Sequence, residues 1–385
     1  MTPRVTVLMT VYNGQPYLRE AIDSVLAQTF RDFELLVVDD ASQDGSLETI
    51  RAYRDPRIHV VAHASNMGQA ASLNEGLRVA RGEYVARLDQ DDRCVATRLD
   101  RQAQALDERP ELAVVGSWVY YSDASGRTTG VVGMRVENFG HLLGALLIGA
   151  SPFGHPSVMF RRSMILDAGG YPEEFAPCED YALWCRLAAI RRPAISLRTP
   201  LTMLRQHDGQ QSTQRAARQR DRCQAAHLEL LTRILGSEPS LELAAMLRAD
   251  ETFMTGRNAS ADVHAQLQPL LARLATMLTS VDEQRALRRR LAWWLGRSAF
   301  LGAFDRAPAR LAMRRAATRI DPLAIRYPTM WLSPVAEVVG LVCPPSTRER
   351  IRRATAHVGR RRAAARLFHE QLARSPDAPS NGHAA

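Results

Sequence analysis

Three carboxylates follow a short apolar segment near residue 90, and this is the most informative stretch of the chain. Residues 83–88 read Glu-Tyr-Val-Ala-Arg-Leu, and Asp89, Asp91 and Asp92 come directly after them. Clustered carboxylates repel one another unless a cation joins them, and the hard cations Mg²⁺ and Mn²⁺ prefer oxygen ligands. A cation held here could bind a diphosphate. A solvated acidic loop is the alternative that this segment alone leaves open.

Two earlier segments show the same change from apolar to polar residues. Thr10 and Tyr12 follow the apolar residues 5–9, and Asp39 and Asp40 follow a second apolar run. Ligands of open α/β sheets bind at the carboxyl ends of the strands. Together the three segments predict a nucleotide crevice with an aromatic ring to stack, carboxylates to accept hydrogen bonds and a cation for phosphates. The chain has no Gly-x-Gly-x-x-Gly motif and no lysine, which excludes the usual dinucleotide and phosphate-loop sites.

The elements that must position these residues alternate between strand and helix over the first 212 residues. Short apolar runs predict strands at 5–9, 34–39, 58–62, 84–88, 113–121, 157–160 and 195–197. Helical spacing of apolar residues predicts helices over 16–28, 46–53, 67–80, 97–108, 137–148 and 181–191. This alternation is typical of an α/β fold, Rossmann-like, with a mostly parallel sheet and helices on both faces.

The second half of the chain has a different character. Beyond about residue 213 strand signals vanish, and Ala, Leu and Arg at helical spacing predict a mostly α-helical region. Residues 1–212 carry 22 Arg and 26 acidic residues, net −4, whereas the remainder carries 28 Arg and 15 acidic residues, net +13. We therefore expect an acidic site domain over 1–212, a basic helical domain over 213–374 and a disordered tail over 375–385.

The basic half allows three interpretations. The first is a solvated arginine face. The second is peripheral contact with an anionic membrane through residues 288–294, which combine arginines with two tryptophans. Nucleic-acid binding ranks last, because no recognised motif accompanies the charge, and no nucleic-acid partner is expected.

Composition also predicts a location. The sequence contains no run of about 18 apolar residues, so it predicts no membrane-spanning helix, and we recognise no secretory signal at its start. Five cysteines at irregular spacing indicate no zinc site and favour reduced thiols. We expect a cytoplasmic protein, with the inner face of the membrane as the peripheral alternative.

Eight segments, in order, resemble glycosyltransferase family 2. They are residues 5–14, 24–33 (SVLAQTFRDF), 36–46 (LVVDDASQDGS), 66–76, 82–92 (GEYVARLDQDD), 155–160 (HPSVMF), 178–184 (CEDYALW) and 205–212 (RQHDGQQS). The resemblance covers about residues 4–212 and implies the GT-A fold. It implies an inverting, non-processive glycosyltransferase that uses a nucleotide-diphosphate sugar, in cell-surface polysaccharide or glycoconjugate biosynthesis. The acceptor would be a glycan, a lipid-linked or a protein hydroxyl. Ala96 departs from the family, which usually has proline there.

The resemblance also assigns roles to single residues. It implies that Asp180 is the catalytic base and that Glu179 lies on the acceptor side. It implies a Mg²⁺ or Mn²⁺ ion held at Asp89, Asp91 and His207. It also implies a set of residues that bind the nucleotide sugar: Thr10, Tyr12, Asn13, Asp39, Asp40, Asn74, Asp89 and Arg205. Of these, Thr10, Tyr12 and Asp40 would hold the base, and Asp39 would lie near the ribose.

From the residues alone, some of these positions keep other interpretations. Asp180 suits a helix N-cap equally well. His155 is expected to be structural, and His207 to be either a cation or phosphate contact or an ordinary loop histidine. Two other functions remain as alternatives for the whole chain: a metal-dependent nucleotidyltransferase and a non-catalytic nucleotide-sugar-binding protein.

Overall fold

The computed structural model describes residues 2–207, 209–210, 216–248, 263–301 and 307–326. Among them a nine-stranded sheet runs in the order β3-β2-β1-β4-β8-β6-β9-β5, with β7 paired to β6. The strands are β1 (Val5–Val11), β2 (Phe33–Asp39), β3 (Ile58–Ala62), β4 (Tyr84–Arg87), β5 (Arg93–Cys94), β6 (Val114–Ser122), β7 (Thr128–Val132), β8 (Met159–Arg161) and β9 (Ala194–Arg205).

The sheet is parallel where the predicted site lies and mixed beyond it. Strands β3, β2, β1 and β4 are all parallel neighbours, and so are β6 and β9. Strand β8 is antiparallel to both β4 and β6, and β5 and β7 are antiparallel to their partners. The predicted strand at 157–160 is shorter than expected, because the 3₁₀ turn η1 (His155–Ser157) precedes β8. The α/β fold with helices on both faces is confirmed.

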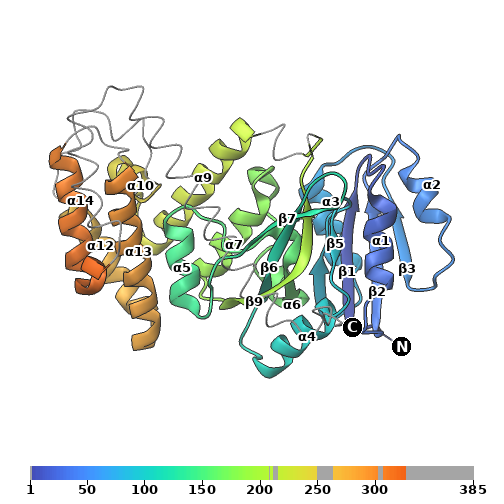
Figure 1. Ribbon diagram of the computed structural model, residues 1–385, viewed down its shortest axis with the longest axis horizontal. Helices are drawn as coiled ribbons and strands as arrows, with labels where there is room; N and C mark the ends of the chain where they lie inside the picture. Colours follow the sequence, from blue (N-terminus) through green and yellow to red (C-terminus); the bar gives the residue numbers. More distant parts are fainter. Residues whose placement is uncertain (1, 208, 211–215, 249–262, 302–306, 327–385) are drawn as a thin grey trace, which may run out of the picture.

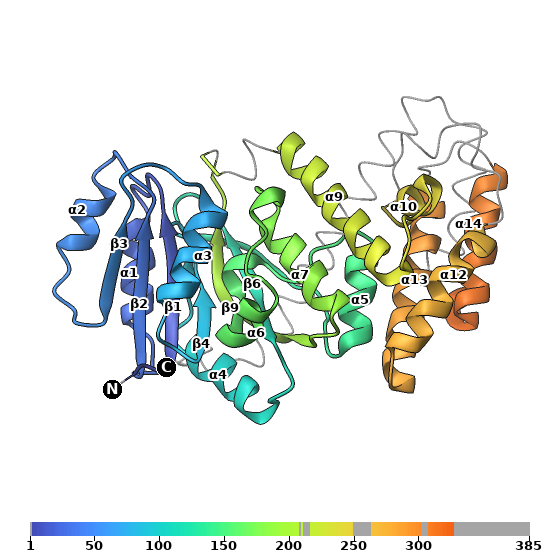
Figure 2. The ribbon, with the colours of Figure 1, turned by 180° about the vertical axis from the view of Figure 1, so that it is seen from behind.

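Helices cover the two faces of the sheet because apolar side chains alternate along its strands. Val7 and Met9 of β1 pack with α1 (Leu18–Leu26) and α4 (Arg98–Glu108), whereas Leu8 faces the opposite core. Figure 1 shows α1 and α4 in front of the sheet, and Figure 2 shows the other face. That face carries α3 (Gln69–Val79), α5 (Phe139–Leu147), α6 (Arg162–Asp167) and α7 (Glu179–Ala189). Two short elements, α2 (Ser46–Arg51) and η2 (Glu173–Phe175), complete this half.

The C-terminal helices extend the same core and lie at the end of the molecule away from β3 (Figures 1 and 2). They are α9 (Ala216–Leu235), α10 (Leu241–Arg248), α12 (Val263–Met277), α13 (Val281–Leu301), α14 (Ala307–Ile320) and η3 (Pro322–Arg326). Leu230 of α9 and Leu291 of α13 belong to one buried cluster with residues of α5 and α7. The boundary predicted at residue 212 stays a prediction, and this shared core runs across it.

The segment predicted for membrane contact is part of α13. Leu291 and Ala292 are buried there, and Trp294 packs against the core, so packing explains much of its apolar content. Within the described ranges, no helix is both long and apolar enough to cross a membrane. The predicted tail at 375–385 lies outside the described residues.

One disulfide corrects the expectation of reduced thiols. Cys178, the residue before α7, is bonded to Cys223 of α9, with their Cα atoms 5.6 Å apart. Cys94 and Cys185 are free. The irregular spacing could not reveal this pair, because the two cysteines lie 45 residues apart in sequence and are brought together only by the packing of α7 on α9.

Removing this disulfide is expected to destabilise the chain without changing its fold. The bond closes a 45-residue separation, for which loss of unfolded-state entropy gives roughly 4 kcal/mol. We expect Cys223→Ser to lower the denaturant midpoint accordingly, and dithiothreitol to do the same to the parent. Cys94→Ser, which leaves the disulfide intact, is the control. A thiol count that does not rise by two when the unfolded parent is reduced would contradict the bond.

Candidate functional site

The predicted strand ends do meet at one edge of the sheet. In the register of β1 and β2, Val11 lies opposite Asp39, and Leu8 lies opposite Arg87 of β4. The chain leaves β1 toward β2 and β3 on one side and returns to β4 on the other. The switch between β1 and β4 is the point at which open α/β sheets bind ligands.

The acidic loop after β4 is held in a defined shape by basic groups. Asp89 pairs with the buried Arg87, while the side chain of Asp92 accepts a hydrogen bond from the backbone N–H of Arg205 at 2.9 Å. Burial, together with repulsion from Asp91 and Asp89, raises the pKa of Asp92 well above its ordinary value. Burial likewise raises the pKa of Asp89, against the opposing effect of Arg87. A bound cation would relieve the repulsion among these carboxylates, so the loop suits a cation.

Arg87 is a part of the site that the motif does not mark. Its side chain is completely buried, and it donates to the hydroxyl of Thr10 at 3.2 Å as well as to Asp89. It therefore links the ends of β1 and β4. The sequence signal for this role is a single arginine inside an otherwise apolar strand. Arginine is almost never fully buried unless it is paired, so such an arginine indicates a polar partner.

The predicted cation ligands Asp91 and His207 are in contact with each other. The Nε2 atom of His207 lies 2.9 Å from the Oδ2 atom of Asp91, and both side chains are partly exposed. No group of three His, Cys, Asp or Glu side chains within the described residues could hold a metal ion. Mg²⁺ typically binds through one or two carboxylates and takes its other ligands from phosphates and water. These two residues therefore fit a cation shared with a diphosphate.

The loop after β1 leaves one aromatic ring available. The backbone of Tyr12 is held by Gln90, which accepts from its N–H at 2.8 Å and donates to its carbonyl at 3.2 Å. Tyr12 remains 47% exposed, as its predicted stacking on a base requires. Asn13 adopts a left-handed backbone, and its side chain accepts a hydrogen bond from Gln43 at 2.8 Å. Asn13 thus joins the loops that follow β1 and β2.

The adjacent Asp39 and Asp40 have different surroundings. Asp40 accepts hydrogen bonds from the N–H groups of Met67 at 2.7 Å and Gly68 at 2.8 Å, and it lies 2.8 Å from His63 Nδ1. Its carboxylate braces the loop before α3. The Oδ1 atom of Asp39 is buried and has no hydrogen-bond partner in the protein. Unpaired buried acceptors are costly, so Asp39 has an acceptor left for a ligand, and the predicted contacts of both carboxylates with the nucleotide stay predictions.

Asn74 is also engaged within the protein. Its side chain accepts from the N–H of Tyr171 and donates to the carbonyl of Tyr171, each at 2.8 Å, and it donates to Glu173 at 3.0 Å. It fixes the segment that leads into α7. Its predicted contact with the nucleotide sugar stays a prediction.

The Glu179-Asp180 pair begins α7 beside the acidic loop. Cys178 occupies the N-cap position and makes no side-chain cap, so the N-cap interpretation of Asp180 is not realised. Burial raises the pKa of Asp180, and repulsion from Asp89 adds to the rise, which places the two carboxylates within electrostatic reach. Burial and the neighbouring Asp180 raise the pKa of Glu179 to about 7, and its Oε2 atom has no partner.

His155 and Tyr171 form a second polar contact near this pair. The Nε2 atom of His155 lies 2.9 Å from the Tyr171 hydroxyl, and burial lowers the pKa of His155 well below its ordinary value. A neutral imidazole bonded to a buried tyrosine agrees with the expected structural role.

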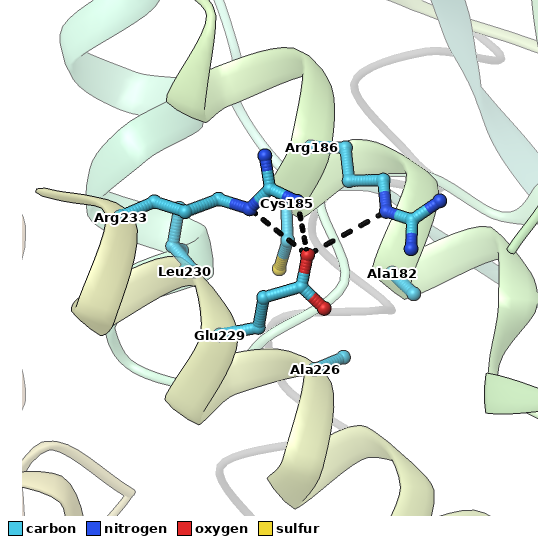
Figure 3. Close-up of a pocket in the computed structure, with 7 residues that line it drawn as sticks. All are labelled: Ala182, Cys185, Arg186, Ala226, Glu229, Leu230 and Arg233. Atoms are coloured by element: carbon cyan, nitrogen blue, oxygen red, sulfur yellow. Dashed lines mark hydrogen bonds and ion pairs between the residues drawn. The ribbon is translucent and has the colours of Figure 1, made fainter. Parts of the chain in front are cut away.

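A small pocket between α7 and α9 is not a ligand site. Figure 3 shows Glu229 of α9 between Arg186 and Arg233, at 2.6 Å from Arg233 and 3.6 Å from Arg186. The pocket is lined by Ala182, Cys185, Arg186, Ala226, Glu229, Leu230 and Arg233, and it has no room for a water molecule. The Glu229–Arg186 ion pair, like the disulfide, joins α9 to the helix that carries Asp180, whereas the Glu229–Arg233 pair lies within α9.

Comparisons with known proteins find a matching family and several similar proteins. The model of the glycosyl transferase family 2 matches residues 6–168. The glycosyltransferase EpsE of Bacillus subtilis is 35% identical over 189 residues, which are 48% of this chain and 66% of EpsE. The amylovoran biosynthesis glycosyltransferase AmsE of Erwinia amylovora is 28% identical over 52% of this chain and 75% of its own length.

A solved structure shares the fold. Residues 1–349 of S. aureus TarS, in complex with UDP-GlcNAc, superpose with a TM-score of 0.50 over 84% of this chain and 92% of that one, at 19% identity. At this identity the likeness shows the fold alone.

Proposed function

Because the chain belongs, through residues 6–168, to glycosyl transferase family 2, we propose that it transfers a sugar from a nucleotide-diphosphate donor to an acceptor hydroxyl. The transfer is direct, non-processive and inverts the anomeric centre. The relative AmsE is named an amylovoran biosynthesis glycosyltransferase, and we propose polysaccharide or glycoconjugate assembly as the setting here.

The observation that carries the proposal is one edge of the sheet with two separate groups of acidic residues. The first is the loop of Asp89, Asp91 and Asp92, with His207 beside it. The second is the Glu179-Asp180 pair. A leaving diphosphate needs positive charge, whereas the acceptor needs a base on the opposite face of the sugar. We propose that the acidic loop meets the first need and that the Glu179-Asp180 pair meets the second.

Each residue then has a definite task. Tyr12 stacks on the base, and Asp39 accepts a hydrogen bond from the nucleotide. Asp91 and His207 would hold a Mg²⁺ or Mn²⁺ ion, which when bound neutralises the charge that develops on the diphosphate. Asp180 accepts the proton of the acceptor hydroxyl as the new bond to the anomeric carbon forms. A single displacement from the opposite face inverts the configuration.

A donor screen tests this function. We expect one nucleotide-diphosphate sugar of a panel to raise the melting temperature in the presence of Mn²⁺, and the nucleoside diphosphate to be released from that donor. We expect chelation by EDTA to stop the release. Binding of a donor without any release, with acceptors of several classes supplied, would favour the non-catalytic alternative. Release of pyrophosphate from a nucleoside triphosphate and a sugar phosphate would favour the nucleotidyltransferase.

A further inference from the structure

Arg205, one of the residues expected to bind the nucleotide sugar, donates hydrogen bonds from its side chain to three groups of the protein itself. It lies at the end of β9 and is 2% exposed. Its three guanidinium nitrogens donate to the carbonyl of Asp91 at 3.1 Å, the carbonyl of Ala124 at 2.8 Å and the carboxylate of Glu20 at 2.8 Å. A guanidinium bound in three directions is a fixed strut, because turning it would leave several buried polar groups unpaired.

The ring of Tyr17 connects this guanidinium to the predicted cation ligand. The Arg205 guanidinium lies over the Tyr17 ring, 4.4 Å from its centroid, and the His207 ring lies 4.9 Å from the same centroid. Tyr17 occupies the N-cap of α1, and Glu20 lies in the first turn of that helix. Helix α1 thus contacts both Arg205 and His207.

The same arginine acts on both cation ligands. It holds the backbone of Asp91 directly and the imidazole of His207 through Tyr17, and its own N–H fixes Asp92. The carboxylate of Glu20 balances the charge of the Arg205 guanidinium, from which it lies 2.8 Å away, and it also lies 3.6 Å from Arg93. Without that carboxylate, an uncompensated guanidinium charge would lie next to a site meant for a cation.

We propose that Arg205 is a positioning residue, and that Glu20 and Tyr17 of the α1 helix act through it to hold Asp91 and His207 in the arrangement that binds the divalent cation. This inference rests on the proposed function, because it concerns the cation of that reaction. It makes a half-exposed glutamate on the first helix part of the cation site, although Glu20 touches neither Asp91 nor His207.

The test is Mn²⁺ binding to the whole purified chain, followed by the paramagnetic resonance signal of free Mn²⁺. We expect Glu20→Gln to raise the Mn²⁺ dissociation constant by about tenfold, the usual effect of losing a partner that orients a metal ligand. The melting temperature should stay close to that of the parent. Glu111→Gln is the matched control, because it also removes an exposed carboxylate paired with one arginine, Arg109. It should bind Mn²⁺ as the parent does.

A double-mutant cycle separates positioning from simple loss of negative charge. If Glu20 acts through Arg205, Glu20→Gln should weaken binding no further in an Arg205→Lys background. Additive losses in that background would overturn the inference. Should Arg205→Lys fail to fold, Tyr17→Leu takes its place in the cycle with the same expectation.

A second measurement addresses direct contact with the diphosphate. Binding of UDP and GDP in EDTA should be the same for Arg205→Lys and the parent, and weaker binding to the variant would overturn the positioning role. Equal Mn²⁺ affinity of Glu20→Gln and the parent would also overturn it, while leaving the proposed function intact. A parent that binds no Mn²⁺, alone or with a nucleoside diphosphate, would overturn the proposed metal dependence and this inference together.

Discussion

Replacing Asp180 by asparagine is expected to abolish sugar transfer while donor binding and folding stay nearly unchanged. The substitution is almost isosteric, but the amide cannot accept the proton of the acceptor hydroxyl. General-base catalysis contributes about a hundredfold to ten-thousandfold, so we expect the transfer rate to fall by that factor. Donor affinity should persist, since Tyr12, Asp39 and the cation loop are untouched. The measurements are transfer rate, donor affinity and melting temperature on one purified variant.

The pH profile and the neighbouring glutamate give this prediction its controls. Burial raises the pKa of Asp180, so the fraction of ionised base, and with it the transfer rate, should fall as the pH is lowered through that raised pKa. Glu179→Gln is the matched variant, because it removes the adjacent carboxylate and should cost far less. If Asp180→Asn transfers sugar at nearly the parental rate and Glu179→Gln does not, Glu179 is the base.

Replacing Asp91 by asparagine is expected to give the second large loss. The side chain of Asp91 is partly exposed and is not part of the hydrophobic core, so the variant should fold. In the parent its carboxylate lies 2.9 Å from His207. Loss of the charged ligand should lower turnover by about a thousandfold, which corresponds to ~4 kcal/mol of transition-state stabilisation. Saturating Mn²⁺ should restore part of the rate if the variant has mainly lost affinity for the ion.

Two comparisons guard this second result. Asp55→Asn removes a carboxylate that pairs with Arg57 at 2.7 Å, in the loop that precedes β3, and should leave the turnover unchanged. The parent in EDTA should lose activity to the same extent as Asp91→Asn. Full activity of the parent in chelator, or of Asp91→Asn without it, would remove the cation from the mechanism.

Much of the fold was predictable because its signals are local. Parallel strands buried on both faces show as apolar runs, and the prediction for β2, whose residues are all buried, differs by one residue from its observed bounds, Phe33–Asp39. The partly exposed edge strand β3 has its predicted bounds, Ile58–Ala62. The two-residue β5 and the largely exposed β7 lack such a run, so they could not be predicted. The partner of β5, β9, lies far along the chain, whereas β7 pairs with the preceding strand β6 across a turn.

The site was predictable as a set of positions but not as a set of contacts. The motif places Asp39, Asp40, Asn74 and Arg205 at the edge of the sheet, yet spacing does not tell which carboxylate is already occupied. Both carboxylate oxygens of Asp40 are hydrogen-bonded within the protein, to Met67, Gly68 and His63, and the side chain of Asn74 is bonded to Tyr171. Such assignments require partners that come from separate loops, and their roles toward the donor remain predictions.

The link between Cys178 and Cys223 also affects the order in which the chain assembles during synthesis. Domains fold largely from the N-terminus as they leave the ribosome. The helix that carries Asp180 emerges early, but Cys223, the covalent partner of Cys178, is made 45 residues later. His207, the proposed cation ligand, also follows that helix in the sequence. The loops after β1 and β2 can therefore fold first on the nascent chain, whereas the cation side and the base side of the proposed site are completed together, once α9 has left the ribosome.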